Sequence, residues 1–200
     1  MVAVGCHVSI AGSVARAVDR AVERGCDVFQ IFTGNPRGWA AKELAPDDAA
    51  AFRKAAGEAG LAAVAHMPYL PNLASPKATV YKRSVEVMVR EMGRCAALGI
   101  PHLITHLGSH LGEGAAAGRE RLSDGIARAL AAGPEGVVIL LENTAGTKNS
   151  MGGTFPEIRD VMDAIDDPGR IGICLDTCHA YAAGYDLASP EAVAATLDAF

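Results

Sequence analysis

The chain contains the run Ile139-Leu140-Leu141-Glu142-Asn143-Thr144-Ala145-Gly146, in which an apolar segment stops at a carboxylate and small or polar residues follow. Strands of a parallel sheet are buried on both faces, so an uninterrupted apolar run is typical of them. Glu142 then lies at the C-terminal end of a predicted strand. Barrels of alternating strands and helices carry their catalytic and ligand-binding groups at this end.

Three further apolar runs end in side chains that can bind metal ions. The runs 62–66, 103–106 and 171–176 end in His66, His106 and Asp176, respectively. The C-terminal ends of parallel strands meet at one rim of the sheet. The four runs therefore predict two imidazoles and two carboxylates close together at this rim.

Composition bounds the class of protein. Of the 200 residues, 50% are hydrophobic and 20% are charged, which predicts one folded domain over residues 1–200. The formal net charge of −5 argues against a nucleic-acid binder that relies on a basic surface, although bound divalent cations would change the local field. We find no secretory leader and no apolar run long enough to cross a membrane, so we expect a cytoplasmic protein. Five cysteines without paired spacing predict free thiols.

The order of apolar runs and helical patterns predicts six strand–helix units. Strands are expected at 2–8, 28–32, 62–66, 103–106, 139–142 and 171–176, with a helix after each. Thr154 and Glu157 form a capping-box pattern, and the run Ser189-Pro190-Glu191 starts a last helix. We predict a TIM barrel that lacks its last two units. An open doubly wound sheet could also hold six strands, but its ligands gather at one switch point and not on successive strand ends.

The predicted rim has the chemistry of a metal centre. Five residues are candidate ligands for Zn²⁺ or Mn²⁺: His66, His106, Glu142, Asp176 and His179. Such a cluster lowers the pKa of bound water, and a second metal holds the attacking and leaving oxygens of a phosphoryl group. Glu142 is the candidate to bridge two metals. A single histidine at a strand end is more often hydrogen-bonded or solvated than metal-bound, so the prediction depends on all five together.

The motifs at these strand ends resemble those of a known family. They are His7-Val8-Ser9, Asn35-Pro36-Arg37-Gly38-Trp39, His66-Met67-Pro68-Tyr69-Leu70-Pro71-Asn72, His106-Leu107-Gly108-Ser109-His110, Glu142-Asn143-Thr144-Ala145-Gly146 and Asp176-Thr177-Cys178-His179-Ala180. In this order they resemble the endonuclease IV family of apurinic/apyrimidinic endonucleases. The resemblance implies a TIM barrel with a trinuclear zinc site. It also implies hydrolysis of the phosphodiester 5′ to an abasic site in double-stranded DNA, which leaves a 3′ hydroxyl.

The resemblance also implies roles for single residues. His66, His106 and Glu142 would bind one zinc, Glu142 and Asp176 a second, and His179 the third. Arg37 and the pair Tyr69-Leu70 match positions that the family inserts into DNA beside the lesion. From the residues alone, a surface arginine and a loop tyrosine packed on the rim would be the simpler interpretation.

Some expectations concern what the chain lacks and what else lies on the rim. The family's remaining zinc ligands belong to the seventh and eighth units, so we expect fewer metals and impaired activity in these 200 residues. His7 and His110 are expected to contact substrate or to orient a ligand. Cys174 is expected in the core. We expect a monomer.

Two other functions fit parts of the pattern. Related barrels bind Mn²⁺ or Mg²⁺ at strand ends and isomerise or epimerise sugars, but their sites are richer in acids and commonly offer a lysine or a second glutamate as base. A fragment could also bind damaged DNA without cutting it. A zinc assay tests the first alternative, and binding without nicking identifies the second.

Overall fold

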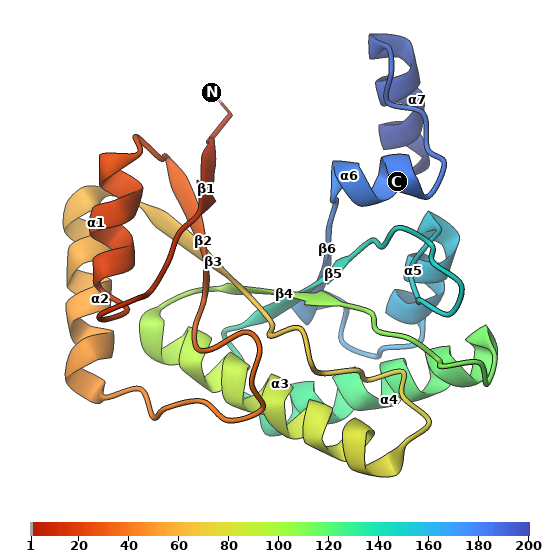
Figure 1. Ribbon diagram of the computed structural model, residues 1–200, viewed down its shortest axis with the longest axis horizontal. Helices are drawn as coiled ribbons and strands as arrows, with labels where there is room; N and C mark the ends of the chain where they lie inside the picture. The colour runs from red at the N-terminus through yellow and green to blue at the C-terminus, as the bar shows by residue number, and fades with distance from the viewer. Residues whose placement is uncertain (1) are drawn as a thin grey trace.

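The fold is known from a computed structural model that describes residues 2–200 (Figure 1). It has six parallel strands in sequential order, each followed by one or more helices. The strands are β1 Gly5–His7, β2 Val28–Phe32, β3 Ala62–His66, β4 His102–His106, β5 Val138–Glu142 and β6 Ile171–Cys174. The helices are α1 Arg16–Glu23, α2 Pro46–Ala59, α3 Ala78–Leu98, α4 Ala115–Ala132, α5 Phe155–Asp163, α6 Thr177–Ala182 and α7 Pro190–Ala199. A short 3₁₀ helix, Pro168–Arg170, precedes β6.

The order of strands is that of a TIM barrel. Each strand pairs in parallel with the next one along the chain, from β1 to β6. Such an order has no reversal and therefore no switch point, so the doubly wound alternative is wrong. Within the described residues β1 pairs only with β2, and β6 only with β5. The structure thus contains six consecutive units of the predicted barrel.

The register between strands brings the strand ends to one rim. His106 at the end of β4 is the partner of Glu142 at the end of β5. On the other side of β4, His66 pairs with Ile104, two residues before the strand end. This stagger is typical of strands that tilt around a barrel axis. It allows the His66 and His106 rings to lie 5.0 Å apart although their residues are not paired.

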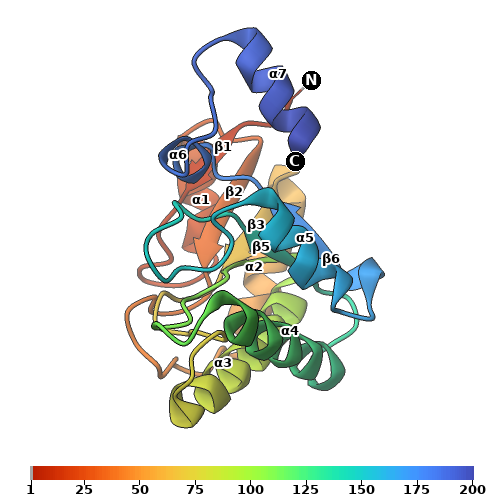
Figure 2. The same cartoon turned by 90° about the vertical axis from the view of Figure 1, so that its right-hand side faces the viewer.

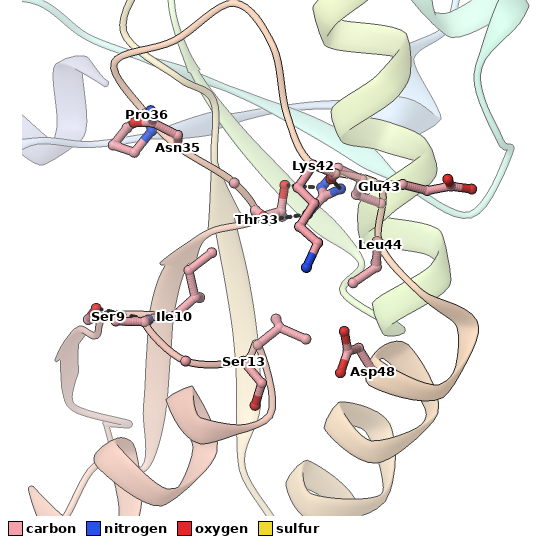
Figure 3. Close-up of a pocket in the computed structure, with 15 residues that line it drawn as sticks. Ser9, Ile10, Ser13, Thr33, Asn35, Pro36, Lys42, Glu43, Leu44 and Asp48 are labelled. Atoms are coloured by element: carbon pink, nitrogen blue, oxygen red, sulfur yellow. Dashed lines mark hydrogen bonds between the residues drawn. The ribbon is translucent and has the colours of Figure 1, made fainter.

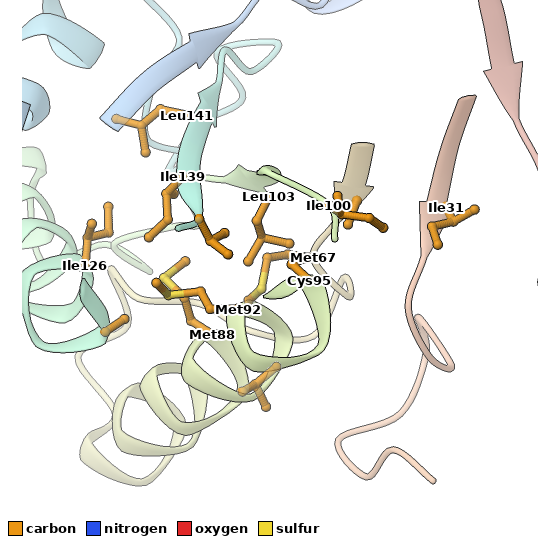
Figure 4. Packing of buried hydrophobic residues seen from close by; sticks show 14 of the residues in the cluster. Ile31, Met67, Met88, Met92, Cys95, Ile100, Leu103, Ile126, Ile139 and Leu141 are labelled. Atoms are coloured by element: carbon orange, nitrogen blue, oxygen red, sulfur yellow. The ribbon is translucent and has the colours of Figure 1, made fainter. Parts of the chain in front are cut away.

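Successive side chains of each strand point alternately to the hydrophobic core under the helices and to the barrel interior. Phe29 and Ile31 of β2 are buried against the helices, whereas Gln30 and Phe32 face the interior cavity. Met88 and Met92 of α3 pack in the same core (Figure 4). Figure 2 shows α3 and α4 side by side at one extreme of the molecule and α7 at the other. In Figure 1, α1 to α5 lie on the outer side of the sheet, so the inner face is left for function.

Two predicted strands are longer than the observed ones. The first was expected over 2–8 but spans Gly5–His7, and Val2 and Val4 are 82% and 66% exposed. The sixth was expected to end at Asp176 but ends at Cys174. Asp176 instead caps α6, a helix that was not predicted, because its Oδ1 accepts a hydrogen bond of 2.7 Å from the His179 amide.

Other local predictions are confirmed. The Thr154 hydroxyl accepts from the Glu157 amide, and the Glu157 carboxylate accepts from the Thr154 amide, so the capping box is present at the start of α5. Ser189 caps α7. All five cysteines are free thiols. Among the helices of residues 2–200, none is both long enough and apolar enough to cross a membrane.

A tyrosine that joins two outer helices gives the fold a predictable response to alkaline pH. Tyr81 of α3 donates a hydrogen bond to Asp124 of α4. Burial, with the hydrogen bond and charge of Asp124, raises the pKa of Tyr81 from 10.0 to about 12. A pKa raised by folding adds stability below the unfolded value and loses it as pH rises through the folded value. We expect Tyr81→Phe to lower the free energy of unfolding by about 1 kcal/mol at neutral pH. In urea unfolding, this difference should shrink between about pH 10 and 12; a constant difference would contradict it.

Candidate metal centre

A cavity of about 430 Å³ opens on the inner side of the sheet at the C-terminal ends of the strands. All six strands or the loops that follow them contribute to its wall. The lining residues are His7, Gln30, Phe32, His66, Tyr69, Ile104, His106, Glu142, Cys174, Asp176 and His179. The five predicted metal ligands are all among them.

Glu142 lies at the centre of this group. Its carboxylate is buried, and Oε2 lies 2.9 Å from Nε2 of His66 and 3.7 Å from Nε2 of His106. Oε1 lies 3.5 Å from Nδ1 of His179. A buried carboxylate is costly unless hydrogen bonds or positive charge compensate it. Three imidazoles around one acid provide this compensation only when they carry a proton or share a cation with it.

The orientation of His66 favours a cation. Its Nδ1 lies 2.7 Å from the Met67 carbonyl oxygen, so the proton on Nδ1 is donated to the main chain. In the neutral ring, Nε2 then presents a lone pair to Oε2 of Glu142 at 2.9 Å. Two lone pairs at this separation suit a shared metal ion, and the backbone hydrogen bond fixes the ring as metal-bound histidines require.

The ligand atoms form two groups that share one residue. His66, His106 and Glu142 make the first group, and Glu142, Asp176 and His179 the second. Within each group the ligand atoms all lie within 4.8 Å of one another. Each group can therefore hold a metal ion, and Glu142 is placed to bridge the two. The structure brings together all five residues that the sequence singled out.

The local environment favours the neutral forms of His106 and His7. Burial lowers the pKa of His106, although the Glu142 carboxylate opposes this effect. Burial and the neighbouring His66 lower the pKa of His7. A neutral imidazole is the form that binds metal, so burial of His106 reduces the competition from protons.

Cys174 was expected in the core but lies on the cavity wall, so this expectation is wrong. The parallel register pairs Cys174 with Glu142, and both side chains face the interior. Burial, followed by the charges of Glu142 and Asp176, raises the pKa of the Cys174 thiol to about 11. The group therefore stays a neutral thiol near pH 7, which makes it a poor metal ligand without a cation beside it.

Two asparagines that were quoted in the motifs without a role tie the rim loops together. The amide of Asn143 accepts 2.6 Å from the Asp176 N–H and donates 3.0 Å to the Asp176 carbonyl. Asn72 pairs in the same way with Ser109, at 3.0 and 2.9 Å. A side-chain amide thus continues the pairing of neighbouring strands beyond their ends. In the sequence, the available sign of this role was an asparagine within a segment of otherwise apolar or small residues.

The Asn143 pair predicts a measurable coupling to Asp176. Asn143→Ala would leave the Asp176 N–H without a partner, whereas the Asp176 carbonyl would keep its hydrogen bond from the Ala180 amide. We therefore expect a loss of about 1–3 kcal/mol in the free energy of unfolding. Metal affinity of the second ligand group should fall as well. Urea unfolding and a zinc titration measure both effects, with Asn149→Ala on the following loop as the control. Equal stability of the two variants would disprove the coupling.

The residues expected to enter DNA lie on the outer lip of the cavity. Tyr69 is 59% exposed, and its ring packs 5.3 Å from Phe32 and 6.3 Å from His106. Leu70 is 40% exposed, and Arg37 is exposed on the neighbouring loop. The Tyr69 N–H donates 3.0 Å to the Pro36 carbonyl, which joins the two loops. Arg37, Tyr69 and Leu70 thus come from adjacent loops, although only Tyr69 of the three lines the cavity.

The two remaining rim histidines differ in position. His7 lines the cavity, with Nδ1 2.9 Å from Nε2 of Gln30 and its ring 4.5 Å from Phe32. His110 is not among the lining residues. Its Nδ1 accepts from the amides of Gly112 and Gly114, in a loop where Leu111 has a φ of 52°. The contacts of His110 therefore serve the shape of the β4–α4 loop.

Comparison with known proteins agrees with the barrel fold and identifies the family. A family described as a xylose isomerase-like TIM barrel matches residues 18–200. A probable endonuclease 4 of Methanoculleus marisnigri is 56% identical over 199 residues, which cover 98% of this chain and 71% of the relative. One of Cenarchaeum symbiosum is 50% identical over 98% of this chain and 71% of its own length.

Solved structures show the same relationship. The crystal structure of endonuclease IV from Thermus thermophilus superposes with a TM-score of 0.84 at 37% identity, over 96% of this chain and 68% of that one. A D-tagatose 3-epimerase-like protein superposes with a TM-score of 0.73 at 20% identity, over 91% and 68% of the two chains. The second likeness shows the fold alone. From its sequence identity to these relatives and its structural likeness to the Thermus thermophilus enzyme, this chain belongs to the endonuclease IV family.

Proposed function

We propose that the chain is the greater part of an endonuclease that hydrolyses the phosphodiester 5′ to an abasic site in double-stranded DNA and leaves a 3′ hydroxyl. The observation that carries the proposal is the buried carboxylate of Glu142, which belongs to two ligand groups at once. Such a shared carboxylate would contribute to both cation sites, and paired cations would supply the charge that phosphoryl chemistry needs. The endonuclease names of the relatives support DNA as the substrate.

Zinc is the metal that the donor set fits best. The two groups offer imidazole nitrogens and carboxylate oxygens, without the all-oxygen environment that Mg²⁺ and Ca²⁺ prefer. Mn²⁺ is the alternative for the same ligands. When bound, zinc would supply a Lewis acid that activates water and neutralises charge on the phosphate.

The protein's own contribution is orientation. The Met67 carbonyl fixes the His66 ring, and Asn143 fixes the backbone of Asp176. Tyr69, Leu70 and Arg37 would hold an opened duplex at the lip, so that the phosphate beside the lesion faces Glu142. His7, at the end of β1 on the cavity wall, would contact substrate or orient water. We give His110 only a supporting role through its loop.

We also propose that further C-terminal strand–helix units complete the barrel. Within residues 2–200 the sheet has unpaired edges at β1 and β6, and the chain spans 71% of the Methanoculleus marisnigri relative. Added units would close the sheet and supply further ligands near His179. These 200 residues alone should then bind fewer than three metals and incise poorly. The proposal includes a monomeric protein that acts in the cytoplasm.

Metal content and incision test the proposal together. Elemental analysis should find zinc in the purified chain. A duplex with one abasic site should be nicked by a protein extended with the C-terminal remainder of the Methanoculleus marisnigri relative. The nicking should stop with chelator and return with zinc. An extended, folded protein that binds zinc but gains no metal-dependent nicking would contradict the proposal.

The sugar epimerase alternative lacks the lysine or second glutamate that such sites commonly offer as base. Of the described residues that line this cavity, none is a lysine, and Glu142 is the single glutamate. Proton transfer at a sugar carbon needs a base in addition to the metal ligands. A non-catalytic DNA-binding role is distinguished by the same assay, because it predicts binding of the abasic duplex without nicking by the extended protein.

A further inference from the structure

One buried acid of the described chain lies outside the metal centre. Glu91 of α3 is 1% exposed, and both oxygens of its carboxylate accept hydrogen bonds. Oε1 accepts from Nε and Nη2 of Arg90 at 3.0 and 2.9 Å, and Oε2 accepts from the Thr33 hydroxyl. A buried ion pair adds little to the free energy of unfolding compared with apolar side chains of the same size. Stability alone therefore does not explain why Glu91 is placed here.

The arginines beside Glu91 hold the main chain of the segment between β2 and α2. Arg90 donates through Nη1 to the Trp39 carbonyl at 2.8 Å. Arg94 donates to the Lys42 carbonyl at 2.9 Å and to the Thr33 hydroxyl at 3.0 Å. Its third hydrogen bond reaches the Thr33 carbonyl. One turn of α3 thus fixes this segment at its start, middle and end.

The fixed segment is a loop with no regular structure of its own. It borders a second cavity of about 460 Å³, around which Figure 3 shows Thr33, Lys42 and Leu44. The guanidinium of Arg83, also on α3, lies 4.7 Å from the centre of the Trp39 ring. Without these contacts from α3, few interactions would select one conformation for the loop.

The loop leads directly to the DNA-facing lip. Arg37 lies between the anchored residues Thr33 and Trp39, and the Pro36 carbonyl accepts from the Tyr69 amide at 3.0 Å. A shift of this segment would therefore move Arg37 and weaken the hydrogen bond between the Pro36 carbonyl and the Tyr69 amide. The two hydrogen bonds that Nε and Nη2 donate to Oε1 of Glu91 orient the Arg90 guanidinium, and this orientation leaves Nη1 aimed at the Trp39 carbonyl.

We infer that Glu91 is a positioning residue for damage recognition: through Arg90, Thr33 and Arg94 it sets the conformation of the loop that presents Arg37 to DNA. The inference rests on the proposed function. The side chain is buried and belongs to neither ligand group, and it acts by ordering the loop before binding. Preorganisation of this kind lowers the entropic cost of association, so its loss weakens affinity without removing a contact.

The test is Glu91→Gln in the 200-residue chain, with Glu86→Gln as the matched control on the exposed side of the same helix. Amide hydrogen exchange in residues 34–44 should become about tenfold faster, because an uncharged amide holds Arg90 less tightly. Affinity for a duplex with an abasic-site analogue should fall about tenfold, which corresponds to one lost charged hydrogen bond. Zinc content and exchange in β4 and β5 should not change.

A double variant shows whether Glu91 affects DNA affinity by positioning Arg37 or by destabilising the protein in general. If Glu91 acts through Arg37, then Glu91→Gln should add little to the affinity lost by Arg37→Ala. Additive losses would overturn the inference, and so would unchanged loop exchange or affinity in Glu91→Gln. Should that variant fail to fold, Thr33→Val removes only the hydroxyl that Glu91 and Arg94 share, and the same outcomes apply. A wild-type chain that binds intact and abasic duplex equally would overturn the proposed recognition of abasic sites, which is a distinguishable result.

Discussion

Replacing Glu142 with glutamine is expected to remove metal binding from both ligand groups at once. Glutamine keeps the size of the side chain but has no negative charge and only one oxygen, so it cannot bridge two cations. Loss of the shared ligand should lower zinc affinity by at least about 100-fold. Incision by the extended protein should fall by about three orders of magnitude, since metal catalysis supplies several kcal/mol.

The test compares three variants by zinc titration, incision and DNA binding. His66→Ala removes a ligand of the first group only, so the second group should keep its metal. Glu135→Gln, at the exposed end of the loop before β5, is the control that changes the same chemical group elsewhere. DNA affinity of Glu142→Gln should be retained, because the lip residues are unchanged. Normal cutting by this variant would show that the assignment of Glu142 is wrong.

The second large effect is expected at the lip. Tyr69→Ala should weaken binding of a duplex with an abasic-site analogue by about 10- to 100-fold, because an exposed aromatic ring that stacks on a base contributes about 1–3 kcal/mol. The ring is suited to this role because Phe32 supports it edge-on at 5.3 Å while 59% of the residue stays exposed. Binding of intact duplex should change little, since electrostatic contacts with phosphates dominate there.

Fluorescence anisotropy with both duplexes measures this selectivity. Tyr69→Phe keeps the ring and is the matched control, so it should bind as the wild type does. Zinc content should stay the same in both variants, which shows that the cavity is intact. An equal loss of affinity for both duplexes in Tyr69→Ala would mean that the ring supports the fold of the lip and does not recognise damage.

The elements that were predicted correctly depend on short-range patterns. The strands at 28–32 and 62–66 and the capping box of α5 have their signals within a few residues of each other. The end of β6 was missed because two local signals compete at Asp176. The apolar run favours a strand up to this residue, whereas its carboxylate caps α6 and so breaks the strand at Cys174.

The sequence by itself determined the order of the strands and the side chains at their ends, and with them the five candidate ligands. Only the tertiary structure decided that Glu142 stands between His66 and His179, with Cys174 on the cavity wall. It alone revealed that Asn143 and Glu91 hold distant loops. The physical reason is that apolar periodicity is written along the chain. Stagger between strands and hydrogen bonds between loops instead join residues up to 76 positions apart, as in the His66–Glu142 pair.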